Sequence, residues 1–375
     1  MSYAARLVTT LATPLDLAAA DAPSPQIGPE ARLVVQRGDT EVVAYDLDEY
    51  AAGGEAAVVR FPAPWPRRFG TVTVSPRLDL AVFAGVHAIR AVDATGAVRW
   101  EIRHGCWDGS CRELHTSFDE YPDSHGHLYA DSGSAAVAAD GKLVWAHIRG
   151  PLASDADPDP GALDEWLVLD AVDGKALARV DAQTAAAGSD HVPPPDPGQM
   201  GLSVGEGQDG VPLLWGRWDG RTLTVDRLGG DEWVLLAVSP SGDRFLTVTH
   251  YQETLAVHRA TDGSVLAEAD AATAVPRHPE TPPDNDEDEP YWDYYAGFLD
   301  EDTVIAATAG SDDEFGTERH WLLDAARMSL TGQIDYPFPI SDWPTALGDG
   351  TWLTGSEAGG ALHLWTLENP ADQAR

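Results

Sequence analysis

The chain has 375 residues, of which 43% are hydrophobic, so it can bury a sizeable core. Acidic residues outnumber basic ones 61 to 24, which gives a formal net charge of -37 at pH 7. Such a charge repels phosphate backbones and anionic lipids, so neither nucleic acid nor a membrane is an expected partner. Two cysteines cannot staple a chain of this size, and a cytoplasmic monomer is the default expectation.

The predicted strands begin with an isolated apolar stretch at residues 5–11, followed by a Pro/Ala-rich connection through Pro29. Two similar units come next, at residues 31–61 and 72–102, and each contains short apolar runs separated by turn residues. A third unit, residues 134–182, has the same pattern with a long loop in its middle.

Four further units complete the chain. The fourth, residues 200–228, is the least regular and could lack a strand. Residues 231–270 hold four short apolar runs with the tight turns PSGD and TDG between them, which predicts a four-stranded antiparallel meander. A sixth unit spans residues 294–336, and the last, residues 346–368, supplies only three strands.

Repetition of one four-stranded unit predicts an all-β fold, a β-propeller that forms a single domain over residues 1–375. The turn SPRLD of the second unit aligns with SPSGD of the fifth, and DATGAVRW with ATDGSVLA. Seven blades are expected, or six if the fourth unit is not a blade, and residues 5–11 are expected to complete the last blade and close the ring. An array of β-sandwiches is the alternative.

The repeats also resemble a known superfamily. SEAGGALHLWTLE places Trp365 where WD40 repeats have their tryptophan, although Thr366 replaces the usual aspartate and no Gly-His pair opens a unit. DATGAVRWEI and AVDGKALARV are similar to quinoprotein-type and YVTN-type repeats. The chain therefore resembles the WD40/YVTN/PQQ-like propellers, which implies a fold but not an activity.

The long segments are expected on one face. Three join consecutive blades, at residues 104–124, 183–199 and 271–290, and two lie within blades, at 151–164 and 310–318. They are acidic, and aromatic residues follow the 271–290 insertion, so this face is expected to bind a basic protein or peptide. The alternatives are solvated loops and aromatic residues that belong to the core. The candidate binding residues are Asp157, Asp286, Asp288, Trp292, Tyr295 and Asp313.

The connection after the second unit concentrates metal-ligating residue types. Thiolates and imidazoles are the ligands that zinc and copper prefer, and a loop could wrap four of them around one ion. A local disulfide and two buried free thiols remain the alternatives, and calcium at the acidic runs 155–159 or 284–288 is less favoured. The candidate metal ligands are His104, Cys106, Cys111, His115, His125 and His127.

No local motif assigns a catalytic residue. The sequence has no Gly-x-Ser-x-Gly elbow in a strand–helix context, no glycine-rich phosphate loop and no H-E-x-x-H. The favoured interpretation is a protein-binding propeller rather than an enzyme. The alternative is a propeller hydrolase or lyase, metal-assisted through the His/Cys connection, with its site at the mouth of the same face.

Overall fold

Short apolar runs separated by Gly- and Asp-containing turns form antiparallel strands throughout the chain. The computed structural model describes residues 2–53, 57–129, 131–155, 164–282, 289–309, 319–356 and 360–368. The chain forms two compact units. The N-terminal unit is Pro14–Asp231, and the C-terminal unit combines Met1–Thr13 with Glu232–Arg375.

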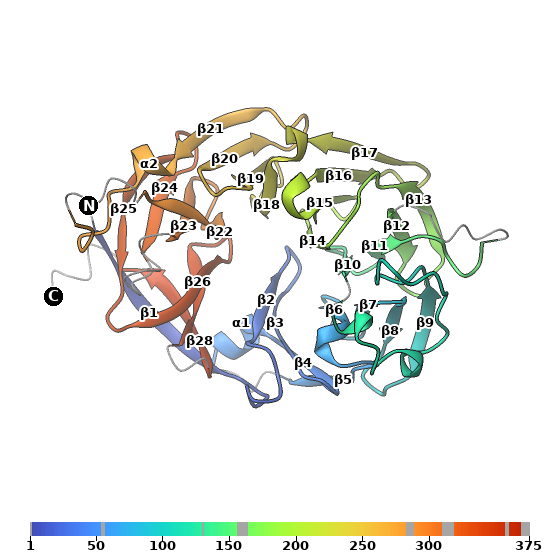
Figure 1. Cartoon of the computed structure of the whole chain (residues 1–375). Helices are drawn as coiled ribbons and strands as arrows, with labels where there is room; N and C mark the ends of the chain where they lie inside the picture. Colours follow the sequence, from blue (N-terminus) through green and yellow to red (C-terminus); the bar gives the residue numbers. More distant parts are fainter. Residues whose placement is uncertain are drawn as a thin grey trace. The chain divides into compact units, whose positions relative to one another are not determined.

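The N-terminal unit contains four sheets, each of four strands that pair in chain order (Figure 1). A short helix, α1 (Leu47–Ala51), lies between β4 and β5, and the Asp46 side chain caps it by accepting from two backbone amides. The strands are β2 (Ser24–Ile27), β3 (Arg32–Arg37), β4 (Glu41–Asp46), β5 (Val59–Pro62), β6 (Gly70–Val74), β7 (Ala81–Gly85), β8 (Ala88–Val92), β9 (Val98–Arg103), β10 (Ser134–Val137), β11 (Leu143–Arg149), β12 (Asp164–Asp170), β13 (Ala176–Asp181), β14 (Gly188–Val192), β15 (Gln199–Gly205), β16 (Leu213–Trp218) and β17 (Leu223–Leu228).

The C-terminal unit contains one four-stranded sheet, β18 to β21, and one eight-stranded sheet with the order β22-β23-β24-β25-β1-β28-β27-β26. A short helix, α2 (Ala271–Ala274), follows β21. The strands are β1 (Ser2–Ala12), β18 (Trp233–Val238), β19 (Arg244–Thr249), β20 (Thr254–Arg259), β21 (Val265–Asp270), β22 (Tyr291–Phe298), β23 (Thr303–Ala309), β24 (His320–Asp324), β25 (Ser329–Asp335), β26 (Ile340–Ala346), β27 (Thr351–Ser356) and β28 (Ala361–Leu367).

Strand β1 supplies the outer partner that the last three strands lack. It pairs antiparallel with β28 from Ala5 opposite Leu367 to Ala12 opposite Ala361. Its first residues also pair in parallel with β25, and this joins two four-stranded groups into one sheet. The number of blades and the closure of a ring stay predictions.

The two middle strands of each sheet carry most of the core. Strands β7 and β12 are buried along almost their whole length, whereas the outer strands β13 and β17 alternate with solvent. A strand that is apolar on both sides needs a neighbouring sheet against each face. The core clusters accordingly run from one sheet into the next within each unit.

Two strands lie where the sequence predicted connections. Strand β2 falls within the expected Pro/Ala-rich connection, and β14 falls within residues 183–199, which were expected to join two blades. That expectation was wrong for β14, which pairs with β15 and completes the irregular fourth unit. Both segments, SPQI and GSDHV, are edge strands with few apolar residues, so they lack the pattern that identifies buried strands.

One polar contact recurs in the three groups of the C-terminal unit. A ring nitrogen on the third strand is hydrogen-bonded to a threonine on the second strand, two positions from the directly paired residue. Each pair satisfies a polar ring atom inside the sheet stack. The pairs are His258 Nε2 with Thr247 Oγ1 at 2.7 Å, Trp321 Nε1 with Thr308 Oγ1 at 3.2 Å, and Trp365 Nε1 with Thr354 Oγ1 at 2.9 Å.

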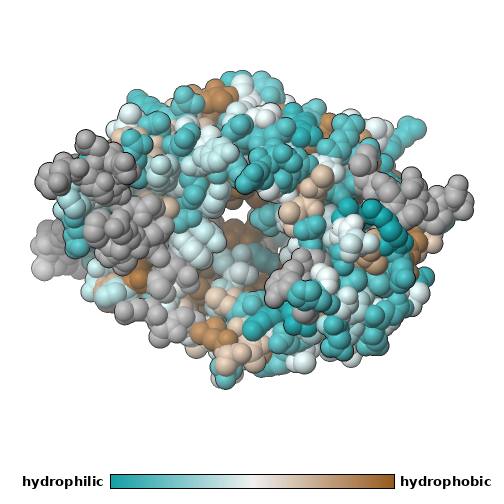
Figure 2. Space-filling model, in the orientation of Figure 1, coloured by the Kyte–Doolittle hydropathy of each residue, from teal (hydrophilic) through white to brown (hydrophobic). Residues whose placement is uncertain are grey.

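Neither α1 nor α2, nor any other helix within the described residues, is long and apolar enough to cross a bilayer. In the view of Figure 2 the coloured surface is mostly hydrophilic, with scattered apolar spots.

Leu11 tests the contribution of β1. It is 1% exposed, whereas Val8 on the same strand is 42% exposed. We expect Leu11→Ala to lower the free energy of unfolding by about 2–4 kcal/mol, because it leaves a cavity, and Val8→Ala to change it by less than about 1 kcal/mol. Urea denaturation of the two variants measures this difference. An equal loss of unfolding free energy in the two variants would show that the Leu11 side chain is not tightly packed.

His258 makes a pH-dependent contribution to stability. Burial lowers the pKa of this imidazole to about 4, from an ordinary value near 6.5. Between these values the unfolded chain binds a proton that the native chain does not, so stability is lost as pH falls from about 6.5 towards 4. For one proton the slope reaches about 1.4 kcal/mol per pH unit.

We expect the stability loss between pH 7 and pH 5 to be smaller in His258→Gln than in the original chain. Urea denaturation at the two pH values measures it. An unchanged loss in the variant would assign the acid sensitivity to other groups.

Candidate metal centre and aromatic surface

The connection between β9 and β10 is anchored at its start. His104 forms an isolated bridge with Leu152, and the Gly105 amide donates to the carbonyls of Arg149 and Pro151, both at 2.9 Å. Trp107 is buried, and its amide donates to Val86. The start of the connection therefore lies against the end of β11 and the residues that follow it.

Four side chains of this connection converge. One ligand atom each from Cys106, Cys111, His115 and His127 lies within 4.8 Å of all the others, and we call these residues the Cys/His cluster. Cys106 Sγ is 3.2 Å from His127 Nε2, and Cys111 Sγ is 3.3 Å from His115 Nε2. The two Nε2 atoms are 3.2 Å apart. The cluster includes four of the six predicted metal ligands.

The other ring nitrogen of each cluster histidine faces an oxygen. His115 Nδ1 is 3.1 Å from a Glu120 carboxylate oxygen. His127 Nδ1 is 3.0 Å from the Ser124 hydroxyl and 3.5 Å from Asp108 Oδ2. Partners of this kind orient imidazoles that bind metals through the opposite nitrogen.

Hydrogen bonds keep the two carboxylates charged. Bonds from Thr116 and then His115 lower the pKa of Glu120 to about 2. Bonds from Ser110 and the nearby His127 lower the pKa of Asp108. Charged carboxylates accept hydrogen bonds and do not donate them, so they favour a proton on each facing Nδ1.

Burial shapes the titration of the cluster itself. It raises the pKa of the Cys106 thiol to about 12 and lowers the pKa of His127. Tyr121 covers the histidines, with its ring centroid 4.8 Å from those of both His115 and His127. Burial therefore favours the neutral forms of Cys106 and His127.

The two remaining predicted ligands lie outside the cluster. His104 is fully buried, but its Nδ1 lies 2.7 Å from the Gly105 carbonyl, and burial lowers its pKa to about 4. His125 is exposed. His104 and His125 are not part of the described cluster, and their role as metal ligands stays a prediction.

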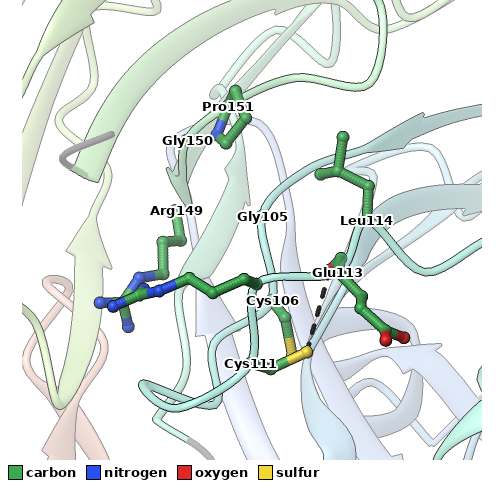
Figure 3. A pocket seen from close by; sticks show the side chains of 9 residues that line it. Gly105, Cys106, Cys111, Glu113, Leu114, Arg149, Gly150 and Pro151 are labelled. Atoms are coloured by element: carbon green, nitrogen blue, oxygen red, sulfur yellow. Dashed lines mark hydrogen bonds between the residues drawn. The ribbon is translucent and has the colours of Figure 1, made fainter. Parts of the chain in front are cut away.

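A cavity of about 200 Å³ adjoins the cluster. Cys106, Cys111, Arg112, Glu113 and Arg149 are among the residues that line it. Figure 3 shows the two cysteine side chains close together, with the Cys111 sulfur 3.9 Å from the Glu113 carbonyl oxygen. The cysteine side of the cluster is therefore the side nearest to solvent.

The predicted binding residues differ in whether the structure describes them and in whether they are exposed. Asp157, Asp286, Asp288 and Asp313 lie outside the described residues. Trp292 is fully buried, and its Nε1 donates to the Ala269 carbonyl at 2.9 Å, so its assignment to an exposed binding site was wrong. Strand alternation turns it inward, into the core between β20, β22 and β23.

Tyr295, by contrast, is 40% exposed and stacks on Trp343, with ring centroids 4.0 Å apart and an angle of 9°. Tyr294 is 39% exposed, and its hydroxyl donates to the His250 carbonyl at 2.6 Å, next to the exposed Tyr251. We call the stacked pair of Tyr295 and Trp343 the aromatic surface. Sequence reasoning missed Trp343, because only the packing of β26 beside β22 brings it to Tyr295.

A buried polar network in the N-terminal unit also escaped the sequence analysis. Ser189 Oγ is 3.0 Å from His147 Nδ1, and Asp164 Oδ2 is 3.9 Å from the opposite nitrogen of His147. This set has the residue types of a nucleophile triad. However, burial and then His104 lower the pKa of His147 to about 3, so its imidazole is a poor general base near neutral pH.

No family model matches the sequence, and no curated protein matches it. The solved structure of U3-55K is 11% identical, with a TM-score of 0.54 over 97% of this chain and 98% of that chain. The structure of Kluyvelomyces marxianus Hsv2 is 7% identical, with a TM-score of 0.54 over 94% of each chain. The fold is a β-propeller.

A third structure, the β-propeller domain of Myceliophteria thermophila Cps50 (Swd1), is 12% identical over 80% of this chain and 97% of that chain. Its TM-score of 0.38 is too low to support an argument. Identities at this level show the fold alone. The prediction of an all-β propeller is thereby confirmed. Propellers share a fold without sharing an activity, so the similarity does not assign a function.

Proposed function

We propose that this propeller is an interaction module that binds a basic protein or peptide through its aromatic surface. The observation that carries the proposal is the stacked pair of Tyr295 and Trp343, which remains about two-fifths exposed in a folded chain. Large exposed aromatic rings on a rigid sheet are the usual anchors of binding sites.

The charge of the chain selects the partner. Aromatic faces attract lysine and arginine side chains, and the formal net charge of -37 adds a long-range attraction for cations. Glu289 and Asp293 lie close to Tyr295 in sequence. The acidic insertion at residues 271–290 leads in sequence directly into β22, which carries Tyr295.

The proposed module is a cytoplasmic monomer. Among the residues that the structure describes, no observation favours the enzyme alternative. Four protein ligands fill a tetrahedral ion and leave no open position for a substrate, and the His147 network lacks an effective base.

We expect a fluorescent peptide rich in lysine and arginine to bind the full chain, more weakly as ionic strength rises. Trp343→Ala and Tyr295→Ala should each raise Kd about tenfold or more, because each removes one ring of the stacked anchor. Fluorescence anisotropy measures both effects.

Phe338→Ala is the matched control. Phe338 is 38% exposed, and its ring packs against His363 and Trp365 rather than in the stacked pair. We expect this variant to bind like the original chain. Equal affinity for an acidic peptide of the same length, or equal weakening by Phe338→Ala, would contradict the proposed site.

A further inference from the structure

We propose that the Cys/His cluster binds one structural Zn²⁺ ion, which clips the β9–β10 connection into a fixed shape. This inference is independent of the proposed peptide binding, because the cluster belongs to the N-terminal unit and the aromatic surface to the C-terminal unit. Three properties of the cluster support a zinc site: the spacing of its ligand atoms, the oxygen partners of its two histidines and the charge of its donor set.

The spacing fits a tetrahedral ion. With Zn–S bonds of about 2.3 Å and Zn–N bonds of about 2.0–2.1 Å, neighbouring ligand atoms lie about 3.3–3.8 Å apart. The three separations in the cluster are 3.2, 3.2 and 3.3 Å, and no pair exceeds 4.8 Å. The ligand atoms thus surround one point at nearly the required distance.

The two imidazoles present Nε2 to the centre of the cluster, and these two nitrogens are 3.2 Å apart. The opposite nitrogen of each ring has an oxygen partner: His115 Nδ1 is 3.1 Å from a Glu120 carboxylate oxygen, and His127 Nδ1 is 3.0 Å from the Ser124 hydroxyl. Partners in this position orient imidazoles that bind a metal ion through Nε2, so the arrangement of the rings suits one shared ion.

The charge of the donor set matches a divalent ion. Two thiolates and a Zn²⁺ ion sum to zero, so the occupied site places no net charge in its buried surroundings. Calcium takes oxygen ligands, which the cluster lacks, and blue-copper sites use one thiolate with two imidazoles. Two cysteines with two histidines in a closed set are typical of structural zinc.

The clip would stabilise a segment that has little regular structure. Between β9 and β10 the described residues contain only the 3₁₀ turns Phe118–Glu120 and Gly126–Tyr129. The four ligands draw the connection together from its beginning, at Cys106, to its second turn, at His127. Bound zinc would also fix the wall of the adjoining cavity, which contains Cys106 and Cys111.

The test is elemental analysis of the full, untagged chain by inductively coupled plasma mass spectrometry. We expect about one zinc per chain, and at least an approximately tenfold lower content in Cys106→Ser/Cys111→Ser. His125→Ala is the matched control, because His125 is an exposed histidine of the same connection outside the cluster, and it should retain zinc.

Measurements on the unmutated chain keep the proposal testable if the double variant fails to fold. Stripping zinc with a chelator should lower the melting temperature, and re-addition should restore it. Cobalt substitution should give an intense tetrahedral ligand-field spectrum with thiolate-to-cobalt charge transfer. Glu120→Ala should weaken zinc affinity by about 10–100-fold in a chelator competition, since it removes the partner that orients His115.

Metal content at background, or zinc retained by the double cysteine variant, would overturn the proposal. So would an intact mass about 2 Da below that of the reduced chain, since it would show that the two thiols are joined as a disulfide. Copper bound in place of zinc in the purified protein would overturn the assignment of the metal. If a zinc-free chain still binds the peptide, the proposed function is supported even though the zinc proposal is not. The failure of one proposal can therefore be told apart from the failure of the other.

Discussion

The structure depends on one constraint: the middle strands of each sheet are apolar on both faces, and no single sheet can bury them. Strand β7 is buried at every position and β12 at all but its last. Each sheet must therefore pack face to face with another, and the core clusters accordingly extend from one sheet to the next within each unit. The outer strands face solvent on one side and carry the charges. This repetition explains how a chain with a net charge of -37 still holds a dense core.

Some of the polar groups in that core have partners that recur from one strand group to the next. In the C-terminal unit a threonine on the second strand of each group meets a ring nitrogen on the third, as in the pair of Thr354 and Trp365. The β9–β10 connection has no such ladder, yet it buries His115 and His127 beside two cysteines. The zinc ion proposed above would give these four side chains a shared partner.

The two proposed sites differ in how they use the acidity of the chain. The aromatic surface lies in solvent, where a long-range negative potential raises the rate and affinity of encounter with a cationic partner. The Cys/His cluster is shielded by Tyr121, and its thiolates would balance the ion locally, so the overall charge matters little there. Salt should therefore weaken peptide binding and leave the zinc in place.

The sequence by itself determined the fold class and the segment that carries the Cys/His cluster. Turns such as PSGD and strands such as RFLTVTH can be predicted from sequence, because turn residues and the alternation of apolar side chains are local patterns of a few residues. The edge strands β2 and β14 lack that pattern, so only pairing with β3 and β15 revealed them. Tertiary structure alone decided that His127 joins Cys106 while His104 does not, that Trp292 is core, and that Trp343 stacks on Tyr295. Such contacts join residues far apart in sequence, and the packing of loops and sheets that creates them leaves no periodic trace in the chain.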